Sequence, residues 1–319
     1  LALVDAGLIN LDDPVSTYLG DSIDWPIDKT SITMRMLLNH TSGLPFDSPC
    51  LADNTTTLQA CAQEIANRPL TIPIPGSAFL YSGAGYQLAG YVAQQAAGVP
   101  WTELFEQYLG EPLGISSFRY LGDENPRIGG GALSGTLDYL KLMRMFLDGG
   151  RANGKQVLSS DSAASVTADQ ISPRLMFGKP VDGSLDGYSN GWWLSAEDAH
   201  PGSAGPELSD PGLFGATPWM DFDKGYSAAL WVVKDTTSGV ALWRQLRPLI
   251  LQQIENEAAE VEATAKLREE DYQLAYAVDI LKGLAAVDFR ADQVPTAATP
   301  AVTGEGSGTE GTGAAKTNG

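Results

Sequence analysis

The pattern of apolar and polar positions changes once along the first 254 residues. Up to Leu147, apolar residues recur three or four positions apart, as in the predicted helix 87–97, which Gly98 ends. From Tyr188 the spacing is typical of strands. The predicted helices are 34–38, 62–68, 87–97, 101–108, 139–147 and 240–254, and the predicted strands are 192–194, 212–221 and 225–233. The sequence therefore predicts helices in the middle of the chain and an antiparallel sheet near its end, covered by a last helix.

Capping and turn signals set several of these boundaries. Asp12 or Asp13 precedes Pro14, which suits the first position of a helix, and residues 30–33 cap the helix 34–38. Gly110 follows the helix 101–108 and is expected to end it.

The composition changes near the end of the chain. Residues 255–284 are rich in Glu, Ala and Leu, which predicts a charged helix that extends the domain or binds a protein partner. Residues 294–319 are mainly Thr, Gly, Ala and Pro, which predicts a disordered tail. We therefore divide the chain into a domain at 1–254, an acidic helical extension at 255–290 and a tail at 291–319.

Charge and hydropathy exclude several classes of function. The formal net charge of −19 opposes binding to nucleic acid, whose phosphates would be repelled. No apolar run approaches the roughly 20 residues of a transmembrane helix. No set of cysteines and histidines has the spacing of a zinc site, and the sequence predicts no metal and no cofactor.

The two cysteines, Cys50 and Cys61, flank a polar loop at 51–57. Two interpretations stay open, namely a disulfide that closes this short loop and two free buried thiols. We expect the disulfide, which in turn predicts an oxidising compartment outside the cytoplasm, in the periplasm or the medium.

The stretch 75–90 contains the strongest candidates for chemistry. A turn and a short apolar run lead to Tyr81 and Ser82, which stand just before Gly83 and a long helical pattern. Such a break commonly places polar side chains at the mouth of a pocket. Tyr81 and Ser82 are therefore candidates for acyl transfer. The alternative is a capped helix start beside a structural tyrosine.

Other candidates are weaker. The motif G-x-S-x-G at 187–191 matches a hydrolase nucleophile elbow formally, but the elbow needs a strand before it and a helix after it. We expect a loop at 181–186 and a strand at 192–194, so the match at Ser189 is interpreted as chance. His40 is expected to hold a tight turn together through its ring nitrogens, and His200 to lie in a loop.

A glycine run at 129–131 suggests a phosphate-binding loop at first sight. No lysine follows it at the required position and no strand precedes it. A close backbone approach at the wall of a pocket is the better interpretation.

An ordered set of segments resembles the β-lactamase-related serine hydrolases, which include class C β-lactamases, D-alanyl-D-alanine carboxypeptidases and β-lactamase-like esterases. The segments are 11–15, 37–44, 75–82, 111–115, 131–138 and the strand after 210–212. The resemblance extends from Leu1 to about Ile254. It implies an α/β fold of the β-lactamase/transpeptidase type, with an antiparallel sheet flanked by helices, a mostly helical subdomain, and the site between them.

The resemblance also implies roles for individual residues. Enzymes of this family use a serine in Ser-x-x-Lys, a Tyr-x-Asn element and a Lys/His-x-Gly strand. Tyr81 corresponds to the tyrosine, a candidate general base, and Ser82 to the residue after it. The implied wall of the substrate and oxyanion site consists of Ser82, Gly83, Asp210, Gly212 and Leu213, the last through its N–H.

Two of these positions depart from the family pattern. Gly83 stands where the asparagine would be, and Asp210 stands where a lysine or histidine would be. A carboxylate at position 210 is expected to raise the pKa of Tyr81, which opposes its use as a base.

The first family motif is missing from this sequence, because none of its nine lysines has a serine three residues earlier. We expect the nucleophile and the first strands to precede Leu1, so that this chain alone is inactive and its sheet has an incomplete edge. The complete protein is predicted to be a serine hydrolase of esterase, amidase or peptidase type, acting on a small-molecule or peptide substrate. The alternative is a non-catalytic protein of the penicillin-binding fold that binds a ligand or a partner.

Overall fold

The computed structural model describes residues 1–177 and 183–270. The chain divides into two compact units, Leu1–Gln252 and Gln253–Gly319. The described part of the second unit, 253–270, belongs to helix α10 (Thr236–Glu270). The predicted helical segments 240–254 and 255–284 are therefore continuous as far as residue 270, and the predicted tail lies outside the described residues. None of the helices in the described part of the chain combines the length and the apolar character of a membrane span.

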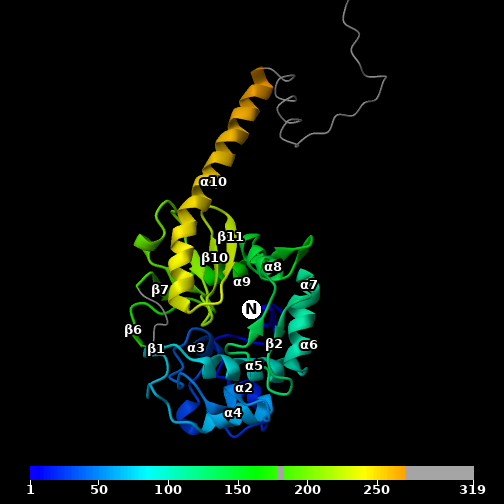
Figure 1. Ribbon diagram of the computed structural model, residues 1–319. Helices are drawn as coiled ribbons and strands as arrows, with labels where there is room; N and C mark the ends of the chain where they lie inside the picture. The colour runs from blue at the N-terminus through cyan, green and yellow to red at the C-terminus, as the bar shows by residue number, and fades with distance from the viewer. Residues whose placement is uncertain (178–182, 271–319) are drawn as a thin grey trace, which may run out of the picture. The chain divides into compact units, whose positions relative to one another are not determined.

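The N-terminal part of the first unit is helical and has its own apolar core. Its elements are α1 (Ala2–Asp5), α2 (Ser16–Leu19), the 3-10 turn η1 (Ile27–Lys29), α3 (Met34–Leu38), the 3-10 turn η2 (Pro49–Ala52), α4 (Leu58–Asn67) and α5 (Gly83–Ala97). Helix α5 lies among α2, α3 and α4, and Leu88 and Val92 on it are fully buried (Figure 1). Thr33 caps α3 as predicted, because its side chain accepts a hydrogen bond from the N–H of Met36.

The predicted helix start at Pro14 is wrong. Helix α2 begins at Ser16, because Pro14 forms an isolated antiparallel bridge with Thr33 instead. Asp12 does not cap this helix. Its carboxylate accepts two hydrogen bonds from the guanidinium of Arg35, at 2.6 and 2.8 Å, which ties the first loop to α3.

Cys50 and Cys61 form the expected disulfide. Helix α4 begins at Leu58, before Cys61 rather than after it, and the side chain of Thr57 caps it. The disulfide therefore joins the turn η2 to the first part of α4.

A mixed segment connects the helical part to the sheet. It contains α6 (Trp101–Phe105), the π-helical turn η3 (Glu106–Gly110), α7 (Glu111–Leu113), the strands β2 (Arg119–Tyr120) and β3 (Ala132–Leu133), α8 (Thr136–Leu147), the hairpin of β4 (Arg151–Ala152) and β5 (Lys155–Gln156), α9 (Ser160–Ala164) and the 3-10 turn η4 (Ser165–Thr167). Gly110 does not end the helix as predicted, because its φ of −55° is helical. The helical run stops at Gly114, whose φ of 62° is left-handed.

The main sheet has five antiparallel strands in the order β11-β10-β9-β8-β7. They are β7 (Leu185–Tyr188), β8 (Trp193–Ser195), β9 (Glu207–Ser209), β10 (Ala216–Asp221) and β11 (Tyr226–Trp231), with the 3-10 turn η5 (Glu197–Ala199) between β8 and β9. A separate parallel pair joins β1 (Ala78–Leu80) to β6 (Leu175–Phe177). The strand predicted at 212–221 begins only at Ala216, and the three-residue β9 was not predicted.

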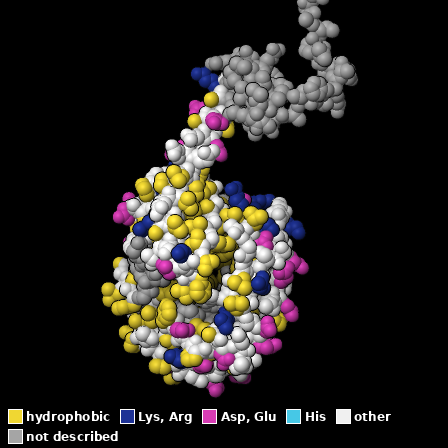
Figure 2. Space-filling view, viewed as in Figure 1, with side chains coloured by type: hydrophobic (Ala, Val, Ile, Leu, Met, Phe, Trp, Pro, Cys, Tyr) yellow, Lys and Arg dark blue, Asp and Glu magenta, His cyan; other side chains and the backbone are white. Residues whose placement is uncertain are grey.

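Helices cover both faces of the main sheet. Successive residues of β10 point to opposite faces, with Trp219 packing against Trp243 of α10 and Met220 clustering with Met143 of α8. Figure 1 shows α10 along one face and α8 beside β11, and Figure 2 shows apolar side chains gathered over α10 and the neighbouring strands. This is the predicted arrangement of an antiparallel sheet flanked by helices, with a mostly helical subdomain.

A buried ion pair fixes α10 to the sheet. The guanidinium of Arg247 on α10 contacts the carboxylates of Glu207 on β9 and Asp221 on β10, and all three residues are buried. The same guanidinium donates to the carbonyl oxygens of His200 and Pro201, which holds the loop before β9.

Candidate active site

Tyr81 lies directly after β1, facing the main sheet. Its ring stacks on Trp193 of β8, with the centroids 5.8 Å apart, and lies 4.3 Å from the ring of His40. Tyr81 is partly exposed, and in the described part of the chain its hydroxyl has no hydrogen-bond partner. Burial raises the pKa of this hydroxyl, and the charge of Asp210 raises it further. Tyr81 is therefore held as a neutral phenol at neutral pH.

Ser82 is the N-cap of α5, which is the alternative that the sequence left open. Its hydroxyl accepts a hydrogen bond from the N–H of Gly85 at 2.9 Å and donates one to the carbonyl of Pro45 at 2.7 Å. The side chain is 1% exposed. These contacts leave the hydroxyl engaged inside the fold, next to Gly83 at the first position of the helix.

His40 has a structural role, as predicted, but its ring nitrogens bond two distant segments instead of holding its own turn together. Its Nδ1 accepts from the N–H of Ser82 at 3.1 Å, so a neutral imidazole carries its proton on Nε2. That Nε2–H donates to the hydroxyl of Tyr188 at 3.1 Å, and the hydroxyls of Tyr188 and Tyr86 are 3.3 Å apart. Tyr86 donates to the carbonyl oxygen of Leu38 at 2.7 Å. Each donor in this series of hydrogen bonds therefore points from His40 toward Leu38.

Burial lowers the pKa of His40 to about 3. The imidazole is therefore neutral at physiological pH and keeps the hydrogen-bond pattern described above. Its φ of 59° lies in the left-handed region, as a tight turn requires. His200, the other histidine, lies in the loop directly after η5, and its Nδ1–H donates to the carbonyl oxygen of Ala196.

Asp210 lies in the turn between β9 and β10. The turn is closed by the N–H of Gly212, which donates to the carbonyl of Ala216 at 2.7 Å. Within the described residues the carboxylate of Asp210 has neither a hydrogen-bond donor nor a cationic partner. Its desolvation by the surrounding protein raises its pKa to about 6. Leu213, the next residue after Gly212, is 74% exposed.

The charge of Asp210 affects four tyrosines from different parts of the chain. Burial raises the pKa of the hydroxyls of Tyr81, Tyr86, Tyr139 and Tyr188, and the charge of Asp210 raises it further. These tyrosines come from the end of β1, from α5, from α8 and from the end of β7. Sequence analysis found Tyr81 and Asp210 through the family pattern but assigned no role to the other three tyrosines.

Ser189 is not a nucleophile elbow. Its predicted upstream loop is partly wrong, because Leu185 and the residues after it form strand β7. The segment that follows is strand β8 rather than a helix, as expected. Ser189 is fully buried in the connection between these two strands and its hydroxyl donates to the carbonyl of Ser165. The geometry therefore agrees with a chance match.

The glycine run at 129–131 makes the close backbone approach that was expected. A Cβ atom on Gly129 would lie 2.5 Å from the carbonyl oxygen of Gly83, which is shorter than any ordinary contact. The loop therefore packs its backbone against the first turn of α5. Only a residue without a side chain fits there without a shift of one backbone segment.

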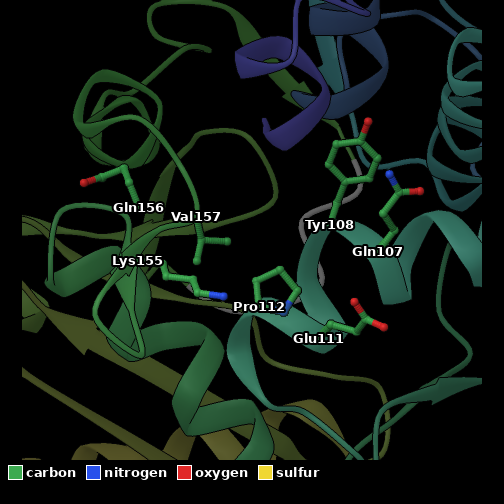
Figure 3. A pocket seen from close by; sticks show the side chains of 7 residues that line it. All are labelled: Gln107, Tyr108, Glu111, Pro112, Lys155, Gln156 and Val157. Atoms are coloured by element: carbon green, nitrogen blue, oxygen red, sulfur yellow. The ribbon is translucent and has the colours of Figure 1, made fainter.

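A hollow of about 300 Å³ lies elsewhere in the first unit, between η3, α7 and the β4–β5 hairpin (Figure 3). Figure 3 shows Lys155 and Val157 on one side, with Pro112 and Tyr108 opposite. Of the residues that line it, Glu111 and Pro112 belong to the family-like segment 111–115, and none is a candidate site residue.

The chain belongs to the Beta-lactamase family, whose model matches residues 1–252. Among curated relatives, the D-alanyl-D-alanine-carboxypeptidase/endopeptidase AmpH of Escherichia coli is 25% identical over 229 residues, which is 63% of this chain and 58% of that protein. The chain therefore spans about three fifths of the length of that relative.

Solved structures show the same fold. A β-lactamase candidate from Bacteroides dorei has a TM-score of 0.63 at 26% identity, over 76% of this chain and 79% of that one. A β-lactamase/D-alanine carboxypeptidase from Yersinia pestis has a TM-score of 0.60 at 22% identity, over 76% and 77% of the two chains. EstCE1, a hydrolase with promiscuous acyltransferase activity, has a TM-score of 0.59 at 20% identity, over 77% and 78%.

Proposed function

We propose that the complete protein is a serine hydrolase that cleaves an ester, amide or peptide bond through an acyl-enzyme, outside the cytoplasm. The observation that carries this proposal is Tyr81, which the resemblance assigns to the family's tyrosine position and whose hydroxyl has no hydrogen-bond partner among the described residues. The nucleophile is a serine of a Ser-x-x-Lys segment that these 319 residues do not contain. The Cys50–Cys61 disulfide supports a compartment outside the cytoplasm.

Tyr81 acts as the general base in this proposal. A serine hydroxyl becomes a strong nucleophile only when a base takes its proton, and a tyrosine can do so only as a phenolate. Burial and Asp210 both oppose the phenolate here. A positive charge is therefore required next to Tyr81, and the lysine of the Ser-x-x-Lys segment would supply it. The N–H of Leu213 is the proposed oxyanion donor.

Covalent labelling tests this proposal. The 319-residue chain should give no adduct with a fluorophosphonate or a penicillin probe, whereas the protein extended upstream of Leu1 by its own coding sequence should give one adduct on the new serine. In the extended protein, Tyr81→Phe should slow labelling strongly and Tyr108→Phe, a matched change at a half-buried tyrosine elsewhere, should not. An adduct on Ser82 or Ser189 in the 319-residue chain would contradict the proposal.

A second function is favoured by two observations. Gly83 replaces the motif asparagine, and the carboxylate of Asp210 has no partner among the residues that the structure describes. In this alternative the fold binds a ligand or a protein partner without chemistry. An upstream sequence without Ser-x-x-Lys, or an extended protein that no serine-directed probe labels, supports this alternative. The charged segment 255–284, which the sequence predicts to be a helix, is the candidate surface for a protein partner, and its residues 271–284 lie outside the described part of the chain.

A further inference from the structure

The hollow of about 300 Å³ in Figure 3 has walls from two separate parts of the chain, and both walls are fixed. One wall is the β4–β5 hairpin with the residue after it, and the other is the helical run of η3 and α7. The side-chain amide of Asn153 in the hairpin turn donates to the carbonyl oxygen of Pro112 on α7 at 2.9 Å, which ties one wall to the other. The amide of Gln156 donates to the carbonyl oxygen of Gly149 at 2.8 Å, which holds the hairpin itself. The hollow is therefore preformed, and its volume is at the lower end of the range for small-molecule sites.

A π-helical turn forms part of the second wall. The turn η3 lies between α6 and α7 in one continuous helical run, and Gln107 on it lines the hollow. Single π-helical turns within helices are rare and are found frequently at functional sites. The backbone geometry therefore points to the same part of the molecule as the hollow does, and it does so independently.

The two walls carry opposite charges. Residues 149–158 contain two cationic side chains and no acid, whereas residues 101–113 contain three acids and no cationic side chain. Of these charged residues, Lys155 and Glu111 line the hollow, and both are exposed. Figure 3 shows the Lys155 side chain extended across the hollow toward Pro112, the residue after Glu111. Among the residues that the structure describes, neither Lys155 nor Glu111 forms an ion pair or a side-chain hydrogen bond.

This arrangement favours one class of ligand. A ligand with negative charge alone is repelled by a protein of formal net charge −19, and one with positive charge alone finds acidic side chains over much of the surface. A ligand that carries both charges can pair with Lys155 on one wall and with Glu111 on the other. The half-buried side chains of Pro112 and Val157 add an apolar contact from each wall.

We propose that this hollow is a binding site for a small zwitterion, namely a free amino acid or a short peptide with both ends free. The ligand carboxylate pairs with the ammonium of Lys155, the ligand ammonium pairs with the carboxylate of Glu111, and the ligand side chain contacts Pro112 and Val157. The site is separate from the candidate active site and does not depend on the proposed hydrolase function. Exposed charge pairs each contribute little, so we expect millimolar affinity and a preference of about fivefold for each pair.

NMR titration of the 15N-labelled 319-residue chain tests this site, because it locates a weak ligand as well as measuring its affinity. The probes are valine and the dipeptide valylglycine, each compared with its C-terminal amide and its N-acetyl form. The pH should be about 6.5, where an α-amino group with an ordinary pKa near 8 is charged. Each zwitterion should shift the signals of residues 107–112 and 151–157 and bind about fivefold tighter than either of its singly charged forms. Tighter binding of valine than of valylglycine would identify the free amino acid as the ligand, and the reverse order would identify a peptide.

Two variants separate the two charge pairs. Lys155→Gln should reduce the preference for the zwitterion over the C-terminal amide to about one and leave the preference over the N-acetyl form unchanged. Glu111→Gln should have the reverse effect. Lys234→Gln and Glu197→Gln make the same changes at exposed positions outside the hollow and should leave both preferences as in the wild type.

The proposal is overturned if no probe shifts the signals around the hollow, or if the singly charged forms bind as tightly as the zwitterions. It is also overturned if the control variants change the preferences as much as the hollow variants do. In those cases the opposite charges of the two walls only help to hold the hairpin against α7. No bond is broken in these measurements, so their outcome is independent of the labelling experiment on the proposed hydrolase.

Discussion

Replacement of Asp210 by asparagine should stabilise the folded chain at neutral pH. Asparagine has nearly the same shape as aspartate, and it removes a charge that the surrounding protein desolvates without a counter-ion. Burial raises the pKa of Asp210 from an ordinary 3.8 to about 6. The folded state therefore holds the proton more strongly than the unfolded chain does, and ionisation of Asp210 destabilises the fold.

The magnitude follows from the size of that shift. One pH unit corresponds to about 1.4 kcal/mol, so a shift of about two units corresponds to at most about 3 kcal/mol. Asp210 is partly exposed, and water screens part of this cost, so we expect a gain of about 1–3 kcal/mol in the free energy of unfolding. The gain should be complete above pH 6, shrink between pH 6 and 4, and vanish below pH 4, where the carboxyl is protonated in both states.

Urea unfolding followed by tryptophan fluorescence measures this effect at pH 7.5 and pH 4. The quantity to compare is the difference in free energy of unfolding between Asp210→Asn and the wild type at each pH. Asp198→Asn makes the same change in net charge at an exposed position and should differ little from the wild type at both values. A variant that is less stable than the wild type at pH 7.5, or one whose gain does not depend on pH, would refute the reasoning.

Two further predictions concern the ties that hold the first unit together. Arg247→Met should lower the free energy of unfolding by about 3–5 kcal/mol, because it leaves the buried carboxylate of Glu207 without its cationic partner. Arg144→Met removes the exposed ion pair with Asp148 and should lower the free energy of unfolding by less than about 1 kcal/mol. Urea unfolding of both variants against the wild type checks this, and equal effects would contradict it. Reduction of the Cys50–Cys61 bond should cost about 3 kcal/mol, and intact mass should show two alkylated thiols only after reduction; alkylation without reductant would rule the bond out.

The sequence predicted the features that depend on neighbouring residues. Thr33 caps α3 and Ser82 caps α5, because a hydroxyl before a helix can reach an N–H three residues later. The spacing of apolar residues also depends only on neighbouring positions, and it correctly predicted the helical part before the sheet. Gly110 was misread as a helix end because glycine tolerates helical φ as well as the left-handed φ that ends a helix.

The tyrosine cluster could not be predicted in this way. Tyr188 is 148 residues from His40, and only the tertiary fold brings the end of β7 beside the turn after α3, where the two side chains are 3.1 Å apart. Strand β9 was missed because it directly follows the stretch 199–206, whose Gly, Pro and Ser residues predict a loop. One signal was available for Tyr86, since a residue four positions after a helix cap faces the preceding segment.

The departure at position 210 has a consequence for Tyr81, the proposed base. In the chain as described, burial raises the pKa of Tyr81 and the charge of Asp210 raises it further, and both effects oppose the phenolate that hydrolysis needs. The positive charge that the proposed mechanism requires next to Tyr81 therefore has to outweigh the carboxylate of Asp210 as well as burial.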